Sequence, residues 1–279
     1  MLAGKLHHPD CVTVVHVDKG VQAASFRKAA GNAMFVPDAQ RVAVHWAGYS
    51  MVEATLAAIR HTLAIAPQTE RFVLLSGSDW PVYPLDVILD RLSGPDELIR
   101  VDRRLDPEGD GWFDTCANHA YLGDNRWLNP RTMPRLVERI VRKVEGRLAR
   151  RAPYATPVFY GPQWWSLTRA TIDHILAELQ GDPNKALWFK YARCPDEMVF
   201  QTLVKASPFA DRIRHDATRG DAAAWPADLA GVHYTRFENG TASPKALGLE
   251  DLVAIRSSGA LFARKMDATR SRALIQALT

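Results

Sequence analysis

The sequence predicts one α/β domain over residues 1–279, with a mainly parallel central sheet flanked by helices. Through the first third of the chain the expected elements follow the order strand, helix, strand, helix, strand, which is typical of a parallel sheet. The length is sufficient for one large hydrophobic core, and 47% hydrophobic and 24% charged residues are ordinary for a globular protein.

The first expected strand covers residues 11–18, which are β-branched and apolar and end in an acidic residue. Asp18 lies at the carboxyl end of this strand or only starts the next turn, and the strand by itself favours the turn. A second short strand is expected at residues 41–46. A helix follows from Ser50, whose hydroxyl fits an N-cap, and Glu53 completes a capping box.

Residues 71–81 are expected to form a buried strand that delivers a polar loop. Four consecutive apolar residues precede Ser76 and Gly77, and ligands of open α/β sheets bind at the carboxyl ends of strands. A buried strand followed by a tight Ser-Gly turn is also ordinary core architecture. The loop 76–79, which ends at Asp79, is therefore a candidate site whose role depends on the rest of the chain.

The middle of the chain contains an irregular segment and a basic helix. Residues 102–134 follow a strand at 98–101, and their aromatic side chains fit a sugar-stacking surface and packing under a loop equally well. Residues 135–151 are expected to form an amphipathic helix whose apolar positions 136, 140, 144 and 148 share one face. Most such helices are simply solvated on their basic side, and contact with an anionic membrane surface or glycan is the alternative.

Two further pairs of residues stand near the ends of expected elements. Trp164 and Trp165 precede a helix, and because neighbouring strand side chains alternate, one packs inward and the other faces a cleft. Asp196 and Glu197 lie in the first turn of another helix, where the backbone dipole favours acidic residues. Capping is the preferred interpretation of this acidic pair when it is taken alone.

The composition of the chain limits which binding partners and which cellular location are expected. A net charge of +4 and a pI near 9.0 suit an anionic ligand but predict no nucleic-acid partner. The three cysteines form no Cys-x-x-Cys pair, so neither a zinc site nor a disulfide framework is indicated. No stretch approaches ~20 apolar residues and no signal peptide is visible. We expect a cytoplasmic protein, with peripheral contact at the inner face of the membrane through helix 135–151 as an alternative.

The absence of several known motifs excludes several classes of enzyme. Dinucleotide-binding, phosphate-loop, serine-hydrolase and zincin signatures are absent from the sequence. No Asp-x-Asp occurs either, so a nucleotide-sugar enzyme on this sheet would need cations rather than a metal for the diphosphate. Arg264 and Lys265, which follow an apolar strand near the carboxyl end of the chain, are suited to that task.

Several short blocks occur together in a fixed order over about 250 residues. The blocks are Val-His-Val-Asp-Lys at 15–19, His-Trp-Ala-Gly-Tyr-Ser at 45–50, Leu-Leu-Ser-Gly-Ser-Asp-Trp-Pro at 74–81, Gly-Pro-Gln-Trp-Trp-Ser-Leu-Thr-Arg at 161–169, Pro-Asp-Glu at 195–197 with Gln-Thr-Leu at 201–203, and Leu-Phe-Ala-Arg-Lys at 261–265. In this order they resemble the core-2/I-branching β-1,6-N-acetylglucosaminyltransferase family, especially its bacterial members.

The resemblance implies a GT-A fold and an inverting transfer from a UDP-sugar, typically UDP-N-acetylglucosamine, to a hydroxyl of an acceptor glycan, without metal or cofactor. It assigns the general base to Glu197 and a diphosphate contact to Lys265, which Arg264 can support. A second basic ligand comes from the strand before the last block, where Arg236 and His233 compete. Arg236 is preferred because it stays charged at neutral pH.

By position, the resemblance also implies contacts to the uridine or ribose and to the sugar and acceptor. Asp18 is expected near the uridine or ribose. The residues expected to border the sugar and acceptor cleft are Ser76, Gly77, Asp79, Trp164, Trp165 and Asp196.

One departure from the family pattern supports a different function. Family members usually begin with a strand and a helix ahead of the position of His8. Either the start of this chain is misassigned, or the donor pocket lacks the wall that the first strand supplies. The alternative function is therefore a catalytically inactive carbohydrate-binding protein on the same fold. A membrane-associated scaffold that uses the basic helix is a third hypothesis.

Overall fold

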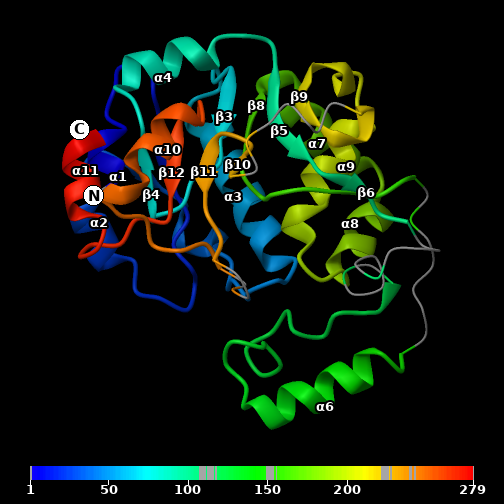
Figure 1. The fold of residues 1–279 in the computed structure, drawn as a ribbon. Helices are drawn as coiled ribbons and strands as arrows, with labels where there is room; N and C mark the ends of the chain where they lie inside the picture. The colour runs from blue at the N-terminus through cyan, green and yellow to red at the C-terminus, as the bar shows by residue number, and fades with distance from the viewer. Residues whose placement is uncertain are drawn as a thin grey trace.

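The computed structural model describes residues 2–106, 111, 116, 118–148, 154, 156–220, 226, 228–238, 241 and 243–278. Helices and several mixed sheets make up the described chain, so the predicted α/β class is confirmed. Two four-stranded sheets lie at its centre, with helices packed around them (Figure 1).

The first sheet contains, in spatial order, β3 (Arg71–Val73), β8 (Trp165–Thr168), β5 (Glu97–Val101) and β9 (Ile213–Asp216). Strand β8 is antiparallel to both of its neighbours, whereas β5 and β9 are parallel. The residues of β5 alternate between buried and half-buried positions, as the period of two in a strand requires.

The second sheet contains, in spatial order, β10 (Leu229–Ala230), β11 (His233–Thr235), β12 (Phe262–Arg264) and β4 (Asp79–Pro81). Only β11 and β12 are parallel. Residues 71–81 therefore contribute β3 to one sheet and β4 to the other, and the loop between these strands crosses from sheet to sheet. The predicted ligand-delivering stretch lies at the junction of the two sheets.

The prediction of one mainly parallel central sheet is wrong. Parallel neighbours need a crossover connection between them, usually a helix. Strand β8 instead follows β5 after a long excursion that returns the chain from the opposite direction, and β4 follows β3 through a short loop. The excursion contains a two-stranded ribbon, β6 (Arg103–Arg104) with β7 (Phe159–Tyr160). The order of elements therefore did not predict the directions of the strands.

The second predicted strand, at residues 41–46, is also wrong. Strand β1 (Val14–Val15) pairs in parallel with β2 (Met34–Phe35) instead. The 41–46 segment lies beside β1, but its backbone amides donate hydrogen bonds to side chains instead of to a neighbouring strand. The amide of Val42 donates to Nε2 of His16 at 2.9 Å, and the amide of Val44 donates to a carboxylate oxygen of Asp18 at 3.0 Å.

The predicted helix after residue 50 is present as α3 (Ser50–Ile65), but its expected capping box is absent. Both the amide and the hydroxyl of Ser50 donate to the carboxylate of Asp124, at 3.1 and 2.5 Å. An acid from the irregular middle segment thus caps this helix, where it also complements the helix dipole.

Helices cover the sheets in separate groups around three clusters of buried apolar residues. The first sheet packs on α3, α7 (Arg169–Gly181), α8 (Pro183–Lys190) and α9 (Val199–Lys205). The second packs on α10 (Leu252–Ser257) and α11 (Arg272–Leu278), and the third cluster includes α1 (Leu2–Lys5) and α4 (Leu85–Leu92). A further helix, α2 (Ala24–Ala29), precedes β2. Short 3₁₀ turns are η1 (Asp38–Gln40), η3 (Pro195–Glu197), η4 (Ala210–Arg212), η5 (Ala217–Arg219) and η7 (Leu249–Asp251).

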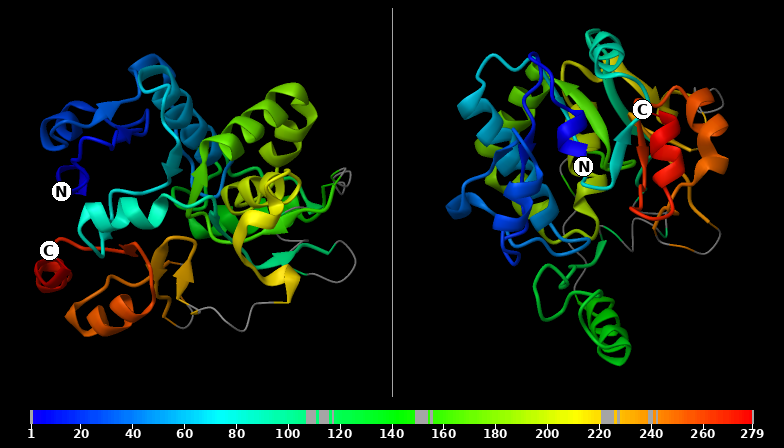
Figure 2. Two further views of the ribbon diagram at one scale, coloured as in Figure 1. Left: turned by 90° about the horizontal axis from the view of Figure 1, so that it is seen from above. Right: turned by 90° about the vertical axis from the view of Figure 1, so that its left-hand side faces the viewer.

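The predicted basic helix is present as α6 (Arg135–Glu145). The last predicted residues, 149–151, lie outside the described chain. Helix α6 stands away from the body of the molecule in two perpendicular views (Figures 1 and 2). No helix in the described ranges combines the length and the apolar character that a membrane span requires.

Candidate active site

A basic and acidic network occupies the junction of the two sheets. Arg264 of β12 and Asp79 of β4 are direct partners across the antiparallel ladder, so their side chains meet on one face. The guanidinium of Arg264 donates to Asp79 at 2.9 Å, to the hydroxyl of Ser78 at 3.2 Å and to the hydroxyl of Ser76. Ser76 closes the turn by donating to Asp79 through its amide and its hydroxyl.

His233 completes this network from β11. Its Nε2 lies 3.0 Å from a carboxylate oxygen of Asp79, and both side chains are inaccessible to solvent. Burial acts to raise the pKa of Asp79, but the hydrogen bond and charge of His233 and the charge of Arg264 together lower it. Because His233 is enclosed beside this carboxylate, it is not free to bind a diphosphate.

Trp164 forms one wall of the network. Its half-buried ring lies 4.9 Å from the ring of His233, and the guanidinium carbon of Arg264 lies 4.3 Å from its centroid. Trp165 instead lies in the first core, 1% exposed and 4.9 Å from the ring of Phe200. The prediction that neighbouring tryptophans face opposite ways is confirmed, and Trp165 does not border a cleft.

Glu197 is the half-buried end of the η3 turn. Tyr160 of β7 donates its hydroxyl hydrogen bond to Oε2 of Glu197 at 2.5 Å. Burial raises the pKa of Glu197 and the charge of Asp102 adds to this effect, although the bond from Tyr160 opposes it. The result is a carboxyl group that binds a proton more strongly than an exposed glutamate and is held in a defined orientation.

Asp196 lies beside Glu197 but faces inward. It is 6% exposed, and its buried Oδ1 has no hydrogen-bond partner within the described part of the chain. Burial and the negative charge of Glu197 raise the pKa of Asp196. Asp196 was predicted to border the sugar and acceptor cleft, but its buried position keeps it away from a ligand there.

We expect Asp196→Asn to stabilise the fold at neutral pH by about 1 kcal/mol, because the folded chain holds this buried carboxyl in its protonated form, whereas the unfolded chain ionises it freely. The pKa of Asp196 is higher in the folded than in the unfolded chain, so ionisation destabilises the fold as the pH rises between those two values. The gain in melting temperature should therefore vanish near pH 4 and be complete above the folded pKa. Thermal unfolding across pH measures it, with exposed Asp90→Asn as control. A gain that did not depend on pH would contradict this explanation.

The carboxylate and the basic network are joined by one short segment. Tyr160 contacts Glu197 and Trp164 contacts Arg264, and four residues of chain span at most about 14 Å between their Cα atoms. Gly161 allows the backbone of this segment to pass close to Arg100, because a Cβ at residue 161 would overlap the carbonyl oxygen of Arg100. The two groups are therefore connected through neighbouring residues of one short segment.

The block at residues 45–50 supports the acidic turn from the other side. The amide of Cys194, just before η3, donates to the carbonyl of Ala47 at 2.9 Å. The carbonyl of Trp46 accepts hydrogen bonds from Tyr121 and Asn129, each at 3.0 Å. The irregular middle segment is thus attached to this block, which explains why residues far apart in sequence share the site.

Lys265 lies next to Arg264 in a region of excess positive charge. It is half-buried, and its ammonium donates to the hydroxyl of Ser243 at 2.6 Å. Burial and the positive charges of Arg264 and Arg131 lower its pKa, although Asp79 partly offsets them. Arg236, which directly follows β11, is 51% exposed and lies 3.5 Å from Asp251. A negatively charged ligand would relieve the repulsion at Lys265.

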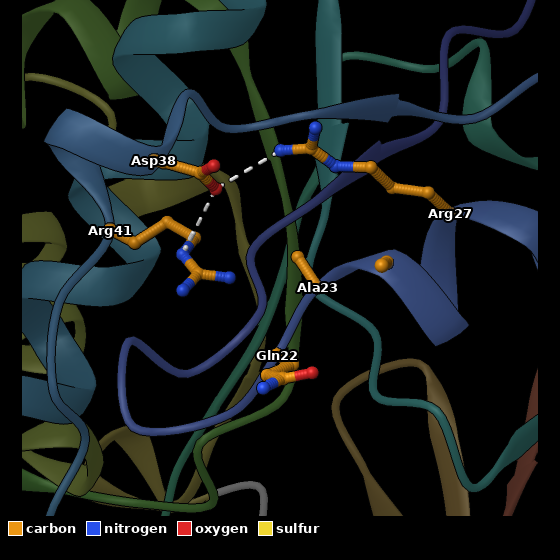
Figure 3. Close-up of a pocket in the computed structure, with 6 residues that line it drawn as sticks. Gln22, Ala23, Arg27, Asp38 and Arg41 are labelled. Atoms are coloured by element: carbon orange, nitrogen blue, oxygen red, sulfur yellow. Dashed lines mark hydrogen bonds and ion pairs between the residues drawn. The ribbon is translucent and has the colours of Figure 1, made fainter.

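Asp18 belongs to a separate turn. Its carboxylate accepts hydrogen bonds from the amides of Gly20 at 2.6 Å and Val44 at 3.0 Å. A cavity of about 360 Å³ lies in the neighbouring part of the chain, lined by Gln22, Ala23, Ala24, Arg27, Asp38 and Arg41 (Figure 3). In it Asp38 pairs with Arg27 at 3.0 Å and with Arg41 at 3.4 Å. This cavity contains neither Glu197 nor Lys265.

The structure groups the predicted residues in a way that sequence patterns only partly anticipated. Ser76, Asp79, Trp164 and Arg264 meet directly, and exposed Gly77 lies at the tip of their loop. Tyr160 was not predicted, because a strand tyrosine carries no signal of its partner. Arg131 was also missed, since it comes from the irregular segment; its guanidinium lies 4.7 Å from the Trp46 ring.

Two comparisons with known proteins bear on the family of the chain. A search of curated proteins found no match to the chain. The family model described as Core-2/I-Branching enzyme matches residues 4–256, which include Glu197 and Tyr160 but end before Arg264. This is a family of glycosyltransferases of the N-acetylglucosaminyltransferase kind, which use a nucleotide-sugar donor and a glycan acceptor. The match covers most of the chain, and the protein therefore belongs to the Core-2/I-branching enzyme family.

Proposed function

We propose that this protein, on a GT-A-like fold, transfers N-acetylglucosamine from UDP-N-acetylglucosamine to a hydroxyl of an acceptor glycan, with inversion and without a metal. The observation that carries the proposal is the half-buried carboxylate of Glu197, held by Tyr160 and having a raised pKa. A general base works best when its pKa approaches the working pH, because it then accepts a proton readily while remaining ionised.

In the proposed reaction Glu197 accepts the proton of the acceptor hydroxyl. The oxygen attacks the anomeric carbon of the donor sugar from the face opposite the phosphate. A carbon–oxygen bond to the acceptor forms as the bond to the diphosphate breaks, and UDP leaves with the bonding electrons. Tyr160 keeps the carboxylate in position, and its own raised pKa ensures that it stays protonated.

Positive charge is required where the diphosphate anion develops. We assign this role to Lys265, supported by exposed Arg236. Arg264 is already engaged by Asp79 and two serines, so its main role in the proposal is to fix the loop 76–79 and the ring of Trp164 at the edge of the cleft. Asp18 remains assigned to the uridine or ribose end of the donor.

Replacing Lys265 by alanine is expected to weaken UDP binding by about 10- to 100-fold. A hydrogen bond to a charged group contributes about 1.5–3 kcal/mol, which corresponds to that range of affinity. Titration calorimetry in EDTA measures it, with exposed Lys5→Ala as a control for the loss of a lysine charge. Equal affinity of the two variants for UDP would show that Lys265 does not bind the donor. UDP binding that required added manganese would contradict the metal-free proposal.

A further inference from the structure

Helix α6 exposes the side that amphipathic helices of globular proteins usually bury. Leu136, Ile140 and Val144 recur every four residues and form one stripe, and their exposed fractions are 68%, 56% and 44%. None of the residues of α6 is buried. The interpretation preferred from sequence, a helix that is only solvated on its basic side, does not account for an uncovered aliphatic stripe.

A hydrogen bond joins the end of this helix to the segment before it. Glu145 accepts a hydrogen bond from the amide of Leu122 at 2.8 Å, and Glu138 pairs within the helix with Arg142 at 2.7 Å. Both glutamates of the helix are therefore engaged, whereas the aliphatic stripe faces away from any described partner. Figures 1 and 2 show the same separation from the two sheets.

Positive charge is concentrated along this helix. Residues 135–148 contain five basic residues and two glutamates, a surplus of three in a chain whose net charge is +4. The basic residues are Arg135, Arg139, Arg142, Lys143 and Arg147. At 100° per residue, most of them lie along one edge of the aliphatic stripe. Trp127, in the segment leading to α6, is 72% exposed and lies 4.4 Å from the guanidinium of Arg126.

We propose that α6 lies flat on an anionic lipid bilayer, with its aliphatic stripe inserted at the headgroup boundary and its basic edge on the phosphates. Interfacial helices have this combination of an apolar face, a cationic face and low overall hydrophobicity. Long basic side chains can keep their charge at the headgroups while their stems cover apolar surface. Exposed tryptophan beside arginine is also typical of the interface.

Other occupants fit less well. A polyanionic glycan or nucleic acid would satisfy the basic edge but leave the aliphatic stripe in water. A second copy of the chain would cover the stripe but place two surpluses of positive charge against each other. An anionic bilayer satisfies both features, and this inference does not depend on the proposed transferase reaction.

The test is co-sedimentation of the full chain with vesicles of phosphatidylcholine alone or with 30 mol% phosphatidylglycerol. We expect binding to the anionic vesicles that weakens with salt. The triple variant Arg135→Gln, Arg139→Gln, Lys143→Gln should bind about 100-fold more weakly, since each basic residue near the surface contributes about a factor of five. The matched control neutralises three exposed cations elsewhere, Lys5, Lys28 and Arg60, and should bind like the unaltered chain.

A second variant, Leu136→Ser, Ile140→Ser, Val144→Ser, separates insertion from plain charge attraction. It should also lose anionic-vesicle binding, with an unchanged melting temperature because the stripe belongs to none of the three buried apolar clusters. Three results would overturn the proposal: no binding of the unaltered chain at low salt, equal binding of the charge variant and its control, or unchanged binding of the serine variant. Self-association of the lipid-free chain that the serine variant abolishes would assign the stripe to a second copy instead.

Discussion

Glu197→Gln should lower the turnover number by about 10²- to 10⁴-fold and leave UDP-sugar binding unchanged. Glutamine has the same shape and can still accept the hydrogen bond from Tyr160, so the η3 turn should keep its geometry. Its amide cannot take a proton from the acceptor hydroxyl, and a positioned general base contributes a factor of this size. Initial rates and calorimetric donor affinity measure the two effects separately.

The pH dependence gives a second readout of the same substitution. Glu197 acts as a base only when ionised, and its pKa is raised in the fold, so the rate should increase with pH through a value above that of an exposed glutamate. This acidic limb should be absent from the residual activity of Glu197→Gln. Exposed Glu70→Gln is the control and should keep both rate and profile. Full turnover in the Glu197 variant would eliminate this residue as the base.

Among glycine-to-alanine substitutions in the described fold, Gly231→Ala should be the most destabilising. It should lower the free energy of unfolding by about 3 kcal/mol or more. Gly231 has a φ of 59°. Its added Cβ would overlap the carbonyl oxygen of Trp164 and lie 3.0 Å from the carbonyl carbon, with the carbonyl of Leu98 at 3.3 Å. All of these neighbours are backbone atoms, so none can rotate away.

The matched control is Gly31→Ala. Gly31 has nearly the same backbone angle, with φ 58°, but a Cβ there would meet open space. Gly31→Ala should therefore lower the free energy of unfolding only by the strain of the left-handed conformation, about 1–2 kcal/mol. Urea unfolding of both variants isolates the clash from the backbone strain. Equal losses would show that the contact between residue 231 and the Trp164 segment does not constrain the fold. A shifted Trp164 should also reduce transfer by the Gly231 variant.

Some features of this fold can be predicted because they depend on local patterns. The stretch 71–81 contains strands, the periodicity at 135–145 forms a helix, and neighbouring tryptophans face opposite ways. Strand direction is different, because it depends on where long connections re-enter the sheet. The cap of α3 illustrates the same point: Ser50 has the right local signal, yet Asp124 supplies the bond from distant sequence.

The candidate site shows the same division. Glu197 and Lys265 were predicted from a resemblance of whole blocks. No local sequence pattern predicted the residues that contact them. The pairing of Arg264 with Asp79 requires the register of β12 against β4, and Tyr160 reaches Glu197 only because β7 lies beside η3. Asp196 and Glu197 are adjacent in sequence, but opposite orientations give one a buried position and the other a half-buried one.

The most direct measurement of the central claim is the anomeric configuration of the product formed from UDP-N-acetylglucosamine and glycan acceptors in the presence of EDTA. Proton NMR of the new linkage distinguishes inversion from retention. We expect a β-linked N-acetylglucosamine on an acceptor hydroxyl, formed by the unaltered chain and not by Glu197→Gln. An α-linked product, or donor binding without transfer to any acceptor tested, would contradict an inverting transferase with Glu197 as its base.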